Sequence, residues 1–327
     1  MDGIVKRISD SPLVGAGAVE GYGPIFNAGV IHHQDRYHLF ARGVREGYRR
    51  NEGDGPRFLD YVSDVLVFTS TDGRSYEFQQ TLALGSFEGV YCYEDPRVQR
   101  IHERGCETVV MTYTHLPPPT SGRPWRVGVD RLDYVDDRFV LRHASARAIG
   151  PSDVPDKDAV VFNIRDGRVA YIHRVHPNIQ LAIFDSLDSL LAAGDEYWTT
   201  HLDEIDSHTI LRPTPGALGI GAGAPPVAVD DGLLLFFHER EANGHYTMRV
   251  ALLDDATGWP LAVLPQAIMR PMLSWERTGD VDDVVFVQGA VPRPDGTIYL
   301  TYGASDRHVG AATVEIGALS AALRAAA

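Results

Sequence analysis

Charged side chains of both signs recur close to the ends of short apolar runs, and their types suit recognition and cleavage of a sugar. Carboxylates and guanidinium groups accept and donate the hydrogen bonds that sugar hydroxyls require. A carboxylic acid among them can also protonate a glycosidic oxygen. The residues in question are Asp95, Asp158, Glu239 and Asp306 on the acidic side, and Arg42, Arg97, Lys157, Arg174 and His238 on the basic side. They predict a carbohydrate site, and a purely structural pairing of Asp95 with Arg97 is the alternative for that pair.

These side chains can share a site only if the fold brings the ends of different strands together. Asn27, Asp95 and Asp158 lie near the starts of predicted strands, whereas Arg42 and Arg174 lie at the ends of the strands that follow. In an antiparallel hairpin the start of one strand lies beside the end of the next. The two groups are therefore expected to meet at one end of a central channel.

A turn followed by an apolar run recurs five times and indicates the fold. The markers Asp35, Gly105, Asp166, Asp231 and Asp295 are separated by 70, 61, 65 and 64 residues. Asp-Gly between apolar runs is a strong hairpin signal. A further extended run follows most of these hairpins, as in 64–69, 126–129, 179–184 and 248–253. Units of three or four antiparallel strands at this period predict an all-β protein, a five-bladed β-propeller.

The repeats leave no low-complexity linker, so residues 1–327 are expected to form one domain. About 20 N-terminal and about 12 C-terminal residues are expected as extensions of the propeller. Residues 45–57 and 116–124 are long insertions, which in compact domains usually act as lids or binding loops. Helical pattern is confined to 187–191 and 319–327.

Composition argues against several classes of partner. The formal net charge of −14 disfavours binding to nucleic acid. The chain opens without the apolar stretch of a signal peptide and has no run of about 18 apolar residues, so we expect no membrane span. Cys92 and Cys106 are too few for a disulfide framework, and His173 with His176 lacks a third metal ligand. A cytoplasmic protein without metal or cofactor is expected, and a homo-oligomer is compatible with the sequence.

Five segments in order resemble glycoside hydrolase family 130, the β-mannoside phosphorylases and mannosidases. The most specific of them is Glu94-Asp-Pro-Arg97. The others are Phe26-Asn-Ala-Gly29 with Tyr37–Arg42, Lys157-Asp-Ala-Val-Val-Phe162 with Ile172-His-Arg174, Gly223-Ala-Pro-Pro226 with Asp231-Gly232 and His238, and Asp283-Val-Val-Phe286 with Gly289 and Tyr302-Gly-Ala-Ser-Asp306. The resemblance covers about residues 23–313 and implies a five-bladed propeller.

The resemblance also implies roles for individual residues. Asn27, Arg42, Asp95 and Asp306 correspond to contacts with the mannosyl residue, with Arg97 and Arg174 completing the substrate-binding set. Arg126, Lys157 and His238 correspond to a site for inorganic phosphate, which would be a co-substrate with an oligosaccharide or other glycoside. In such an inverting reaction phosphate is the nucleophile, so a single acid suffices. Asp95 and Asp158 are the candidate catalytic carboxyl groups.

Two departures from the family pattern leave the reaction open. An aspartate usually follows the Tyr-Thr of the second unit, where this chain has His115 after Thr114, and Glu239 stands where glycine is more usual. Inverting hydrolases use two carboxyl groups about 6.5–9.5 Å apart, so Glu239 with Asp158 or Asp95 could support hydrolysis instead. A propeller that binds sugar without catalysis is the third reading. His115 could replace the missing acid, although a solvated loop histidine is the simpler interpretation.

Overall fold

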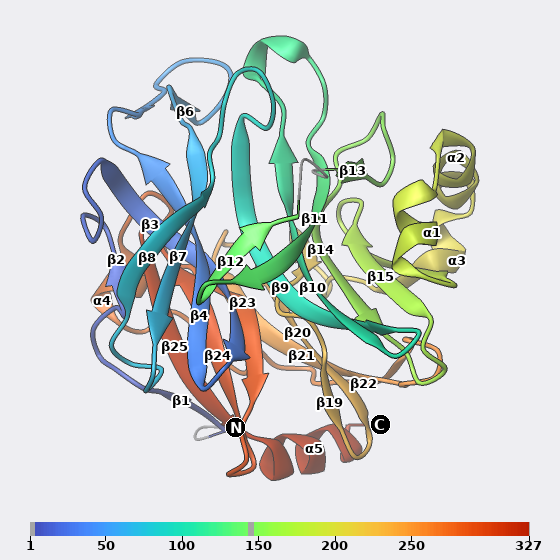
Figure 1. Ribbon diagram of the computed structural model, residues 1–327. Coiled ribbons are helices and arrows are strands. Elements are labelled where there is room, and N and C mark those ends of the chain that lie inside the picture. Colours follow the sequence, from blue (N-terminus) through green and yellow to red (C-terminus); the bar gives the residue numbers. More distant parts are fainter. Residues whose placement is uncertain (1–3, 143–146, 327) are drawn as a thin grey trace.

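Antiparallel strands make up most of the computed structural model, which describes residues 4–142 and 147–326 (Figure 1). They form five consecutive units, blades I to V, of which blades I and II are joined into one sheet by a bridge between Ser63 and Cys92. The innermost strands are β3 (Tyr22–His33), β9 (Cys92–Glu103), β14 (Lys157–Asn163), β18 (Gly219–Ala222) and β23 (Val285–Pro292). The second strands are β4 (Arg36–Arg45), β10 (Cys106–Leu116), β15 (Val169–Arg174), β20 (Gly232–Arg240) and β24 (Thr297–Ala304). The five predicted turn-and-strand units are these hairpins, which confirms the propeller.

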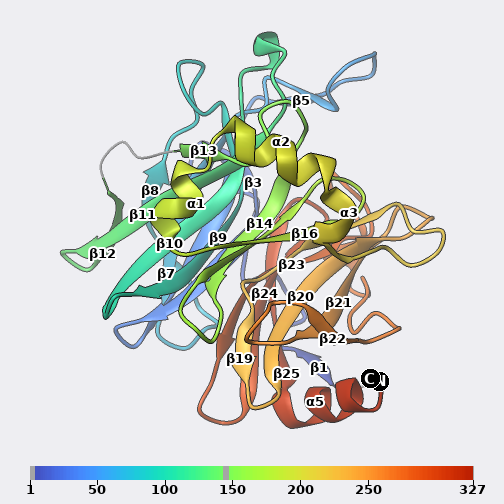
Figure 2. The same ribbon diagram turned by 90° about the vertical axis from the view of Figure 1, so that its right-hand side faces the viewer.

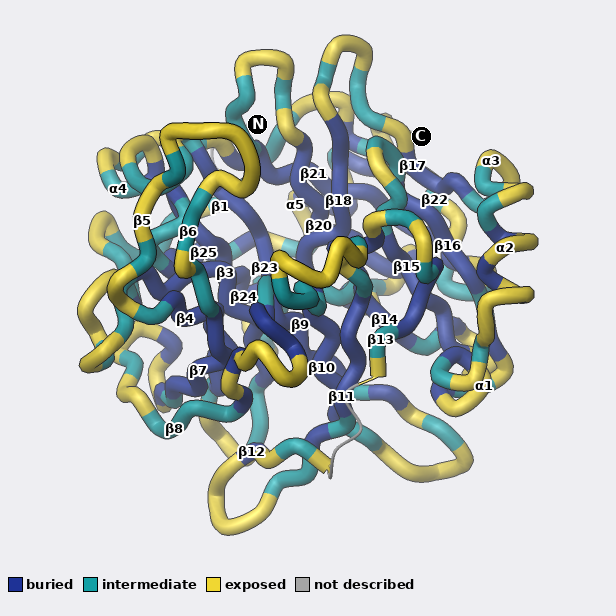
Figure 3. The backbone as a smooth tube through the Cα atoms, turned by 90° about the horizontal axis from the view of Figure 1, so that it is seen from above, coloured by how far each residue is buried: buried dark blue, intermediate teal, exposed yellow. Residues whose placement is uncertain are grey.

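The outer strands complete each blade. Third strands are β7 (Ser63–Ser70), β11 (Arg126–Val135), β16 (Ile179–Phe184), β21 (Tyr246–Leu253) and β25 (His308–Glu315). The outermost strands of blades I to V are, in order, β8 (Glu77–Ala83); β12 (Arg138–Leu141) with β13 (Arg147–Ile149); β17 (Thr209–Leu211); β22 (Pro260–Val263); and β1 (Val5–Arg7) with β2 (Val14–Gly15). In blade IV the short strand β19 (Val227–Val229) also pairs with β20. The inner strands surround the centre of the molecule when it is viewed from above (Figure 3).

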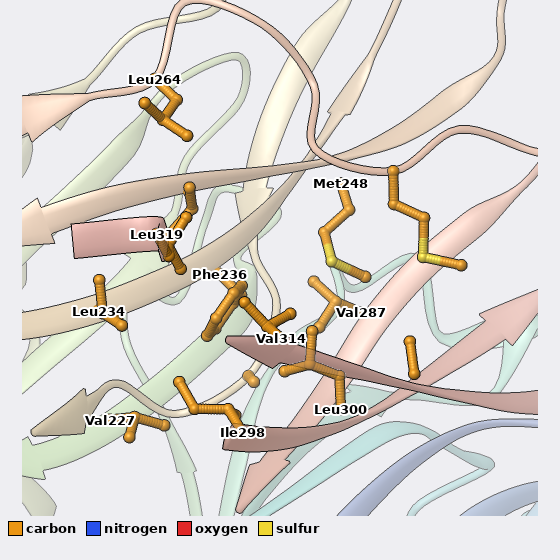
Figure 4. Close-up of a cluster of buried hydrophobic side chains, with 14 of the residues drawn as sticks. Val227, Leu234, Phe236, Met248, Leu264, Val287, Ile298, Leu300, Val314 and Leu319 are labelled. Carbon is orange, nitrogen blue, oxygen red and sulfur yellow. The ribbon is translucent and has the colours of Figure 1, made fainter. Parts of the chain in front are cut away.

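Hydrophobic clusters between neighbouring blades hold the ring together. In β20 both faces are buried, because each blade packs against a blade on either side. Phe236 and Met248 of blade IV pack with Val287 and Leu300 of blade V (Figure 4). Corresponding clusters join blades III and IV, II and III, and I and II. A last cluster joins blade I to blade V, so the ring is closed by packing.

The N-terminal segment, expected as an extension, supplies the outermost strands of blade V. Val5 in β1 lies opposite Val314, and Val14 in β2 lies opposite Val309, both in β25. Arg7 forms an ion pair with buried Glu276, with 2.7 Å between Nε and Oε1. The first and last parts of the described chain therefore share one sheet, while residues 1–3 and 327 lie outside the described residues.

Bulges in the inner strands direct polar side chains toward the channel. Asn27, Asp95 and Asp158 adopt φ values of 47°, 53° and 54°, a left-handed conformation that Asn and Asp tolerate better than most residues. At each of them the pairing register with the next strand shifts. A bulge turns a side chain out of the regular alternation, so three blades present a hydrogen-bonding group at equivalent positions.

Helices are few and lie outside the ring. The two helices predicted at 187–191 and 319–327 correspond to α1 (Leu187–Ala192) and α5 (Ile316–Arg324). Residue 327, where the second predicted helix ends, lies outside the described residues. Three further short helices were not predicted from the sequence, namely α2 (Asp195–Asp203), α3 (Ile205–His208) and α4 (Ser274–Arg277). In α2 the buried residues are Trp198 and His201, which is too small an apolar stripe to be recognised by periodicity. Helices α1 to α3 lie together on one side of the molecule (Figure 2).

The two insertions lie at the upper end of the molecule in Figure 1. The first forms a small hairpin of β5 (Arg49–Arg50) and β6 (Phe58–Leu59). The second contains the short 3₁₀ helix η1 (Pro119–Ser121). Both contribute residues to the cavity described next, as expected of binding loops.

Candidate active site

A cavity of about 580 Å³ opens at the end of the channel that carries the two insertions. Figure 3 looks onto this end, where exposed loops surround the buried inner strands. Of the predicted site residues, those lining the cavity are Asn27, Arg42, Asp95, Lys157 and Asp306. They come from blades I, II, III and V, as the channel-end prediction requires.

Carboxylates and their partners form one part of this cavity, the acidic part, which consists of Glu94, Asp95 and Asp306. Asn27 donates to Asp95 Oδ1 from Nδ2 at 2.7 Å, and Arg42 Nη1 lies 3.4 Å from the same oxygen. Arg42 also donates to Glu94 and to the Tyr61 hydroxyl. Burial raises the pKa of Glu94, and Arg42 opposes this effect. The result is a carboxylate cluster held in place by one guanidinium and one amide.

Asp306 lies in the β24–β25 turn and completes the acidic part. Its φ of 54° is left-handed, like those of Asp95 and Asp158. Burial raises the pKa of Asp306 to about 7, with Asp95 and Glu94 adding to the effect and Arg42 opposing it. In the absence of ligand this carboxyl group therefore still carries its proton in mildly acidic solution.

We expect Asp306→Asn to stabilise the protein by roughly 2–4 kcal/mol above pH 7 and to change little near pH 4. In the unfolded chain the carboxyl ionises near its ordinary pKa of 3.8, whereas the native group holds its proton up to about pH 7. Ionisation therefore penalises the native state increasingly between these pH values, and asparagine removes the penalty. Urea unfolding at pH 4, 6 and 8 measures this, and a difference independent of pH would contradict it.

Asp158 lies behind the cavity in a buried ion-pair cluster. Arg97 Nη2 donates to Asp158 Oδ1 at 3.2 Å, and Arg174 Nε lies 3.1 Å from Oδ2. His238 Nε2 is 3.5 Å from the same Oδ2, and its ring stacks on Phe286 at 4.1 Å between centroids. Burial alone would raise the pKa of Asp158, but Arg174, His238 and Lys157 hold it well below its usual range.

Arg97 connects this cluster to its surroundings. Its guanidinium donates to the carbonyl oxygens of Asp95, Ala222 and Gly223, which lie in blades II and IV. The pairing of Asp95 with Arg97, considered as the structural alternative, is not seen: the Arg97 guanidinium pairs with Asp158, and the Asp95 carboxylate pairs with Arg42. Arg97, Arg174, Asp158 and His238 are not among the residues lining the cavity.

Basic side chains line the same cavity; Arg57 acts on the acidic part at Asp306, and the other three, Arg123, Lys157 and Arg240, are called the cationic part. Within residues 4–142 and 147–326, no carboxylate lies within ion-pair distance of any of the three. Lys157 Nζ lies 6.0 Å from the centroid of the Trp125 ring, which also lines the cavity. Unpaired cations facing a cavity can bind a small anion, since charge-assisted hydrogen bonds to phosphate oxygens are strong.

The predicted phosphate set only partly lines the cavity. Lys157 lines the cavity. Arg126 instead donates from Nη2 to the Gly150 carbonyl at 2.6 Å. His238 contacts Asp158 and stacks on Phe286. His115 lies opposite Arg126 in the β10–β11 pairing. Burial and Arg126 lower the pKa of His115, so it is a poor proton donor at neutral pH.

Glu239 is placed away from the cavity. It follows His238 on β20, and adjacent residues of a strand point to opposite faces. Its carboxylate accepts from Arg249 Nη1 at 2.8 Å, from the Thr214 amide at 2.8 Å and from the Thr214 hydroxyl at 2.9 Å. The structure therefore does not bring Glu239 together with Asp95 or Asp158 at a shared cavity wall. The contacts of Glu239 with Arg249 and Thr214 instead indicate a role in holding the fold together.

Glu239→Gln is expected to leave turnover within about twofold while lowering stability by about 3 kcal/mol, because it leaves Arg249 buried without its counter-charge. Turnover on a glycoside and urea unfolding of the same preparation measure the two effects. A folded variant that lost more than tenfold in turnover would restore the hydrolytic role considered from the sequence.

Several cavity residues were missed by the sequence analysis. Glu94 belongs to the quoted Glu-Asp-Pro-Arg segment, yet it received no role of its own. Arg123 and Tyr61 lie in or beside the insertions, where no periodic pattern marks them, and Arg240 lies just beyond a recognised strand. The density of aromatic and basic residues in the insertions was the available signal.

Within residues 4–142 and 147–326, no group of three or more His, Cys, Asp or Glu side chains could hold a metal ion. The same residues include no helix that is both long and apolar enough to cross a bilayer.

A family model described as beta-1,4-mannooligosaccharide phosphorylase matches residues 4–323. The chain belongs to glycoside hydrolase family 130. A beta-1,2-mannobiose phosphorylase of Thermoanaerobacter sp. (strain X514) is 31% identical over 295 residues, which are 89% of this chain and 90% of that protein. This member of family 130 is thus a glycoside phosphorylase or glycoside hydrolase.

Solved structures of low sequence identity share the fold of this family 130 protein. The beta-1,2-mannobiose phosphorylase of Listeria innocua, solved with beta-1,2-mannobiose, has a TM-score of 0.77 at 19% identity, covering 99% of this chain and 100% of that one. A structure from work on family 130 glycoside hydrolases that target beta-1,2 mannosidic linkages in Candida mannan has a TM-score of 0.66 at 16% identity, covering 94% and 93%.

Proposed function

We propose that this protein is an inverting β-mannoside phosphorylase. Phosphate oxygen forms a bond to the anomeric carbon as the bond from that carbon to the glycosidic oxygen breaks, and the leaving sugar takes a proton. The products are α-mannose 1-phosphate and the shortened sugar. The mannobiose specificity of the Thermoanaerobacter relative makes β-1,2-mannobiose the first substrate to test.

The observation that carries this proposal is that carboxylates line one cavity together with basic side chains that have no ion-pair partner among the described residues. Asp95 is the proposed proton donor, held by Asn27 and Arg42. Lys157, Arg123 and Arg240 are the proposed phosphate ligands, because they face the same cavity without carboxylate partners. Arg174 and His238 contact Asp158 outside the cavity, and Arg126 donates to the Gly150 carbonyl.

Incubation with β-1,2- and β-1,4-linked mannobiose, with and without inorganic phosphate, tests the proposal. We expect α-mannose 1-phosphate only when phosphate is present. Release of free mannose without phosphate would replace phosphorolysis by hydrolysis. Saturable sugar binding without any product would favour the non-catalytic alternative. A cytoplasmic location and a homo-oligomer stay predictions from the sequence.

A further inference from the structure

A buried row of one carboxylate and two imidazoles lies beside the cationic part but outside the cavity. Asp156 lies immediately before Lys157, His173 lies in β15, and His201 lies in α2. His173 Nδ1 is 3.0 Å from the Asp156 carboxylate, and His173 Nε2 is 3.0 Å from His201 Nε2. Asp156 and His173 are fully buried and His201 is 2% exposed. Such polar burial costs free energy unless every group is paired.

The hydrogen bonds of this row run through both ring nitrogens of His173. Nδ1 faces the Asp156 carboxylate, and one proton lies between Nε2 of His173 and Nε2 of His201. Burial, with His173 and His208 nearby, lowers the pKa of His201 to about 3, which keeps that ring neutral. Helix α2 is thereby joined through His173 to Asp156.

Asp156 in turn joins three segments that carry site residues. Its carboxylate accepts from the Arg174 amide at 3.2 Å, which fixes the end of β15. Its own amide donates to the Trp125 carbonyl at 3.1 Å, next to Arg126. Lys157 follows it directly in the chain.

Gly150 makes this arrangement sterically possible. It has a φ of 84°, and a Cβ there would lie 2.4 Å from Asp156 Oδ2. Its carbonyl accepts from Arg126 Nη2 at 2.6 Å. The same glycine therefore admits the Asp156 carboxylate and holds the Arg126 guanidinium.

We propose that Asp156, oriented by His173 and His201, is a positioning residue that sets the geometry of Lys157 and Arg174 for phosphate binding. This inference rests on the proposed phosphorylase function. Simple attachment of α2 to blade III would not need this row, since Trp198 and the apolar cluster between blades II and III already provide packing. The row ends at the backbone amide of Arg174, which donates to Asp156. A residue that positions Arg174 would be expected to make this contact.

The test uses inorganic phosphate as the probe, with calorimetric Kd and the separate KM values for phosphate and mannobiose as readouts. His201→Phe keeps a ring but removes the nitrogen that bonds to His173, and roughly a tenfold rise in the Kd and KM for phosphate is expected. The KM for mannobiose at saturating phosphate should stay within about twofold. His201→Gln, whose amide can donate to His173, should recover most of the affinity for phosphate.

Leu190→Ala is the matched control, because Leu190 of helix α1 belongs to the same apolar cluster and its side chain makes no hydrogen bond to the row. It should lower the melting temperature while leaving phosphate affinity unchanged. If His201→Phe does not fold, His201→Asn, whose amide is too short to reach, takes its place against His201→Gln. Unchanged phosphate affinity in the folded His201 variants would overturn the positioning role alone. Wild-type protein that binds no phosphate would overturn the proposed function and this inference with it.

Discussion

Asp95→Asn is expected to reduce phosphorolysis of mannobiose by about 10³-fold, within the range seen for loss of a general acid. Asparagine tolerates the left-handed φ of 53° at this position, so the bulge in β9 should persist. The amide cannot supply a proton to the leaving sugar, whereas its Oδ1 can still accept from Asn27 and from Arg42, whose Nη1 lies 3.4 Å from Asp95 Oδ1. Initial rates of α-mannose 1-phosphate formation measure the loss.

An activated substrate separates proton donation from binding. An aryl β-mannoside with an acidic phenol as leaving group needs little protonation, so the variant should lose much less activity on it. Asp137→Asn makes the same change at an exposed turn residue with a left-handed φ of 59° and serves as the control. Equal losses on both substrates would assign Asp95 to sugar binding alone.

Lys157→Met is expected to raise the KM for phosphate roughly 10- to 100-fold, because it removes a charged hydrogen-bond donor worth about 1.5–3 kcal/mol. Methionine retains the unbranched apolar stem beside Trp125, so the cavity wall should keep its shape. The measurement is the dependence of rate on phosphate at saturating mannobiose. A change confined to the KM for mannobiose would move Lys157 to the sugar-binding set.

The chain's lysine content allows a second measurement of the same contact. Lys6 and Lys157 are its only lysines. Lys6 is exposed and lies 3.7 Å from Glu315, whereas Lys157 lines the cavity. Phosphate should protect Lys157 from an amine-acylating reagent while Lys6 reacts at an unchanged rate, and Lys6→Met is the kinetic control. Equal labelling of Lys157 with and without phosphate would contradict the assignment.

Contacts between neighbouring strands could be predicted from the sequence. Arg42 with Asp95 and Arg174 with Asp158 were expected at one end of the channel, and ion pairs now join them at 3.4 Å and 3.1 Å. Hairpin geometry is local, so the end of one strand and the start of another can be assigned to the same end of a blade.

Side-chain direction was harder to predict than strand position. His238 and Glu239 are adjacent in sequence, but the pleat turns one toward Asp158 and the other toward Arg249. If the alternation of side chains along a strand is assigned one residue out of step, a carboxylate moves from the cavity to the interior of a blade. Bulges add a further shift that periodicity does not reveal.

The cationic part of the cavity was largely beyond sequence reasoning. Arg123 and Arg240 lie outside the regular pattern of strands, and their approach to Lys157 depends on how insertions of different blades fold over the channel. The Asp156–His173–His201 row depends on α2, a helix whose short apolar stripe gave no recognisable signal.

The sharing of blade V by the two ends of the chain has a consequence for synthesis on the ribosome. β1 is translated long before its partner β25, since the strands of all the other blades lie between them in the sequence. At bacterial or eukaryotic elongation rates of about 5–20 residues per second, that interval is roughly 15 to 60 s. Blades I to IV can each form from consecutive residues, whereas the face of blade I that carries Leu39 and Phe68 stays without its blade V neighbour until then. A nascent chain therefore presents an apolar surface to chaperones for most of its translation.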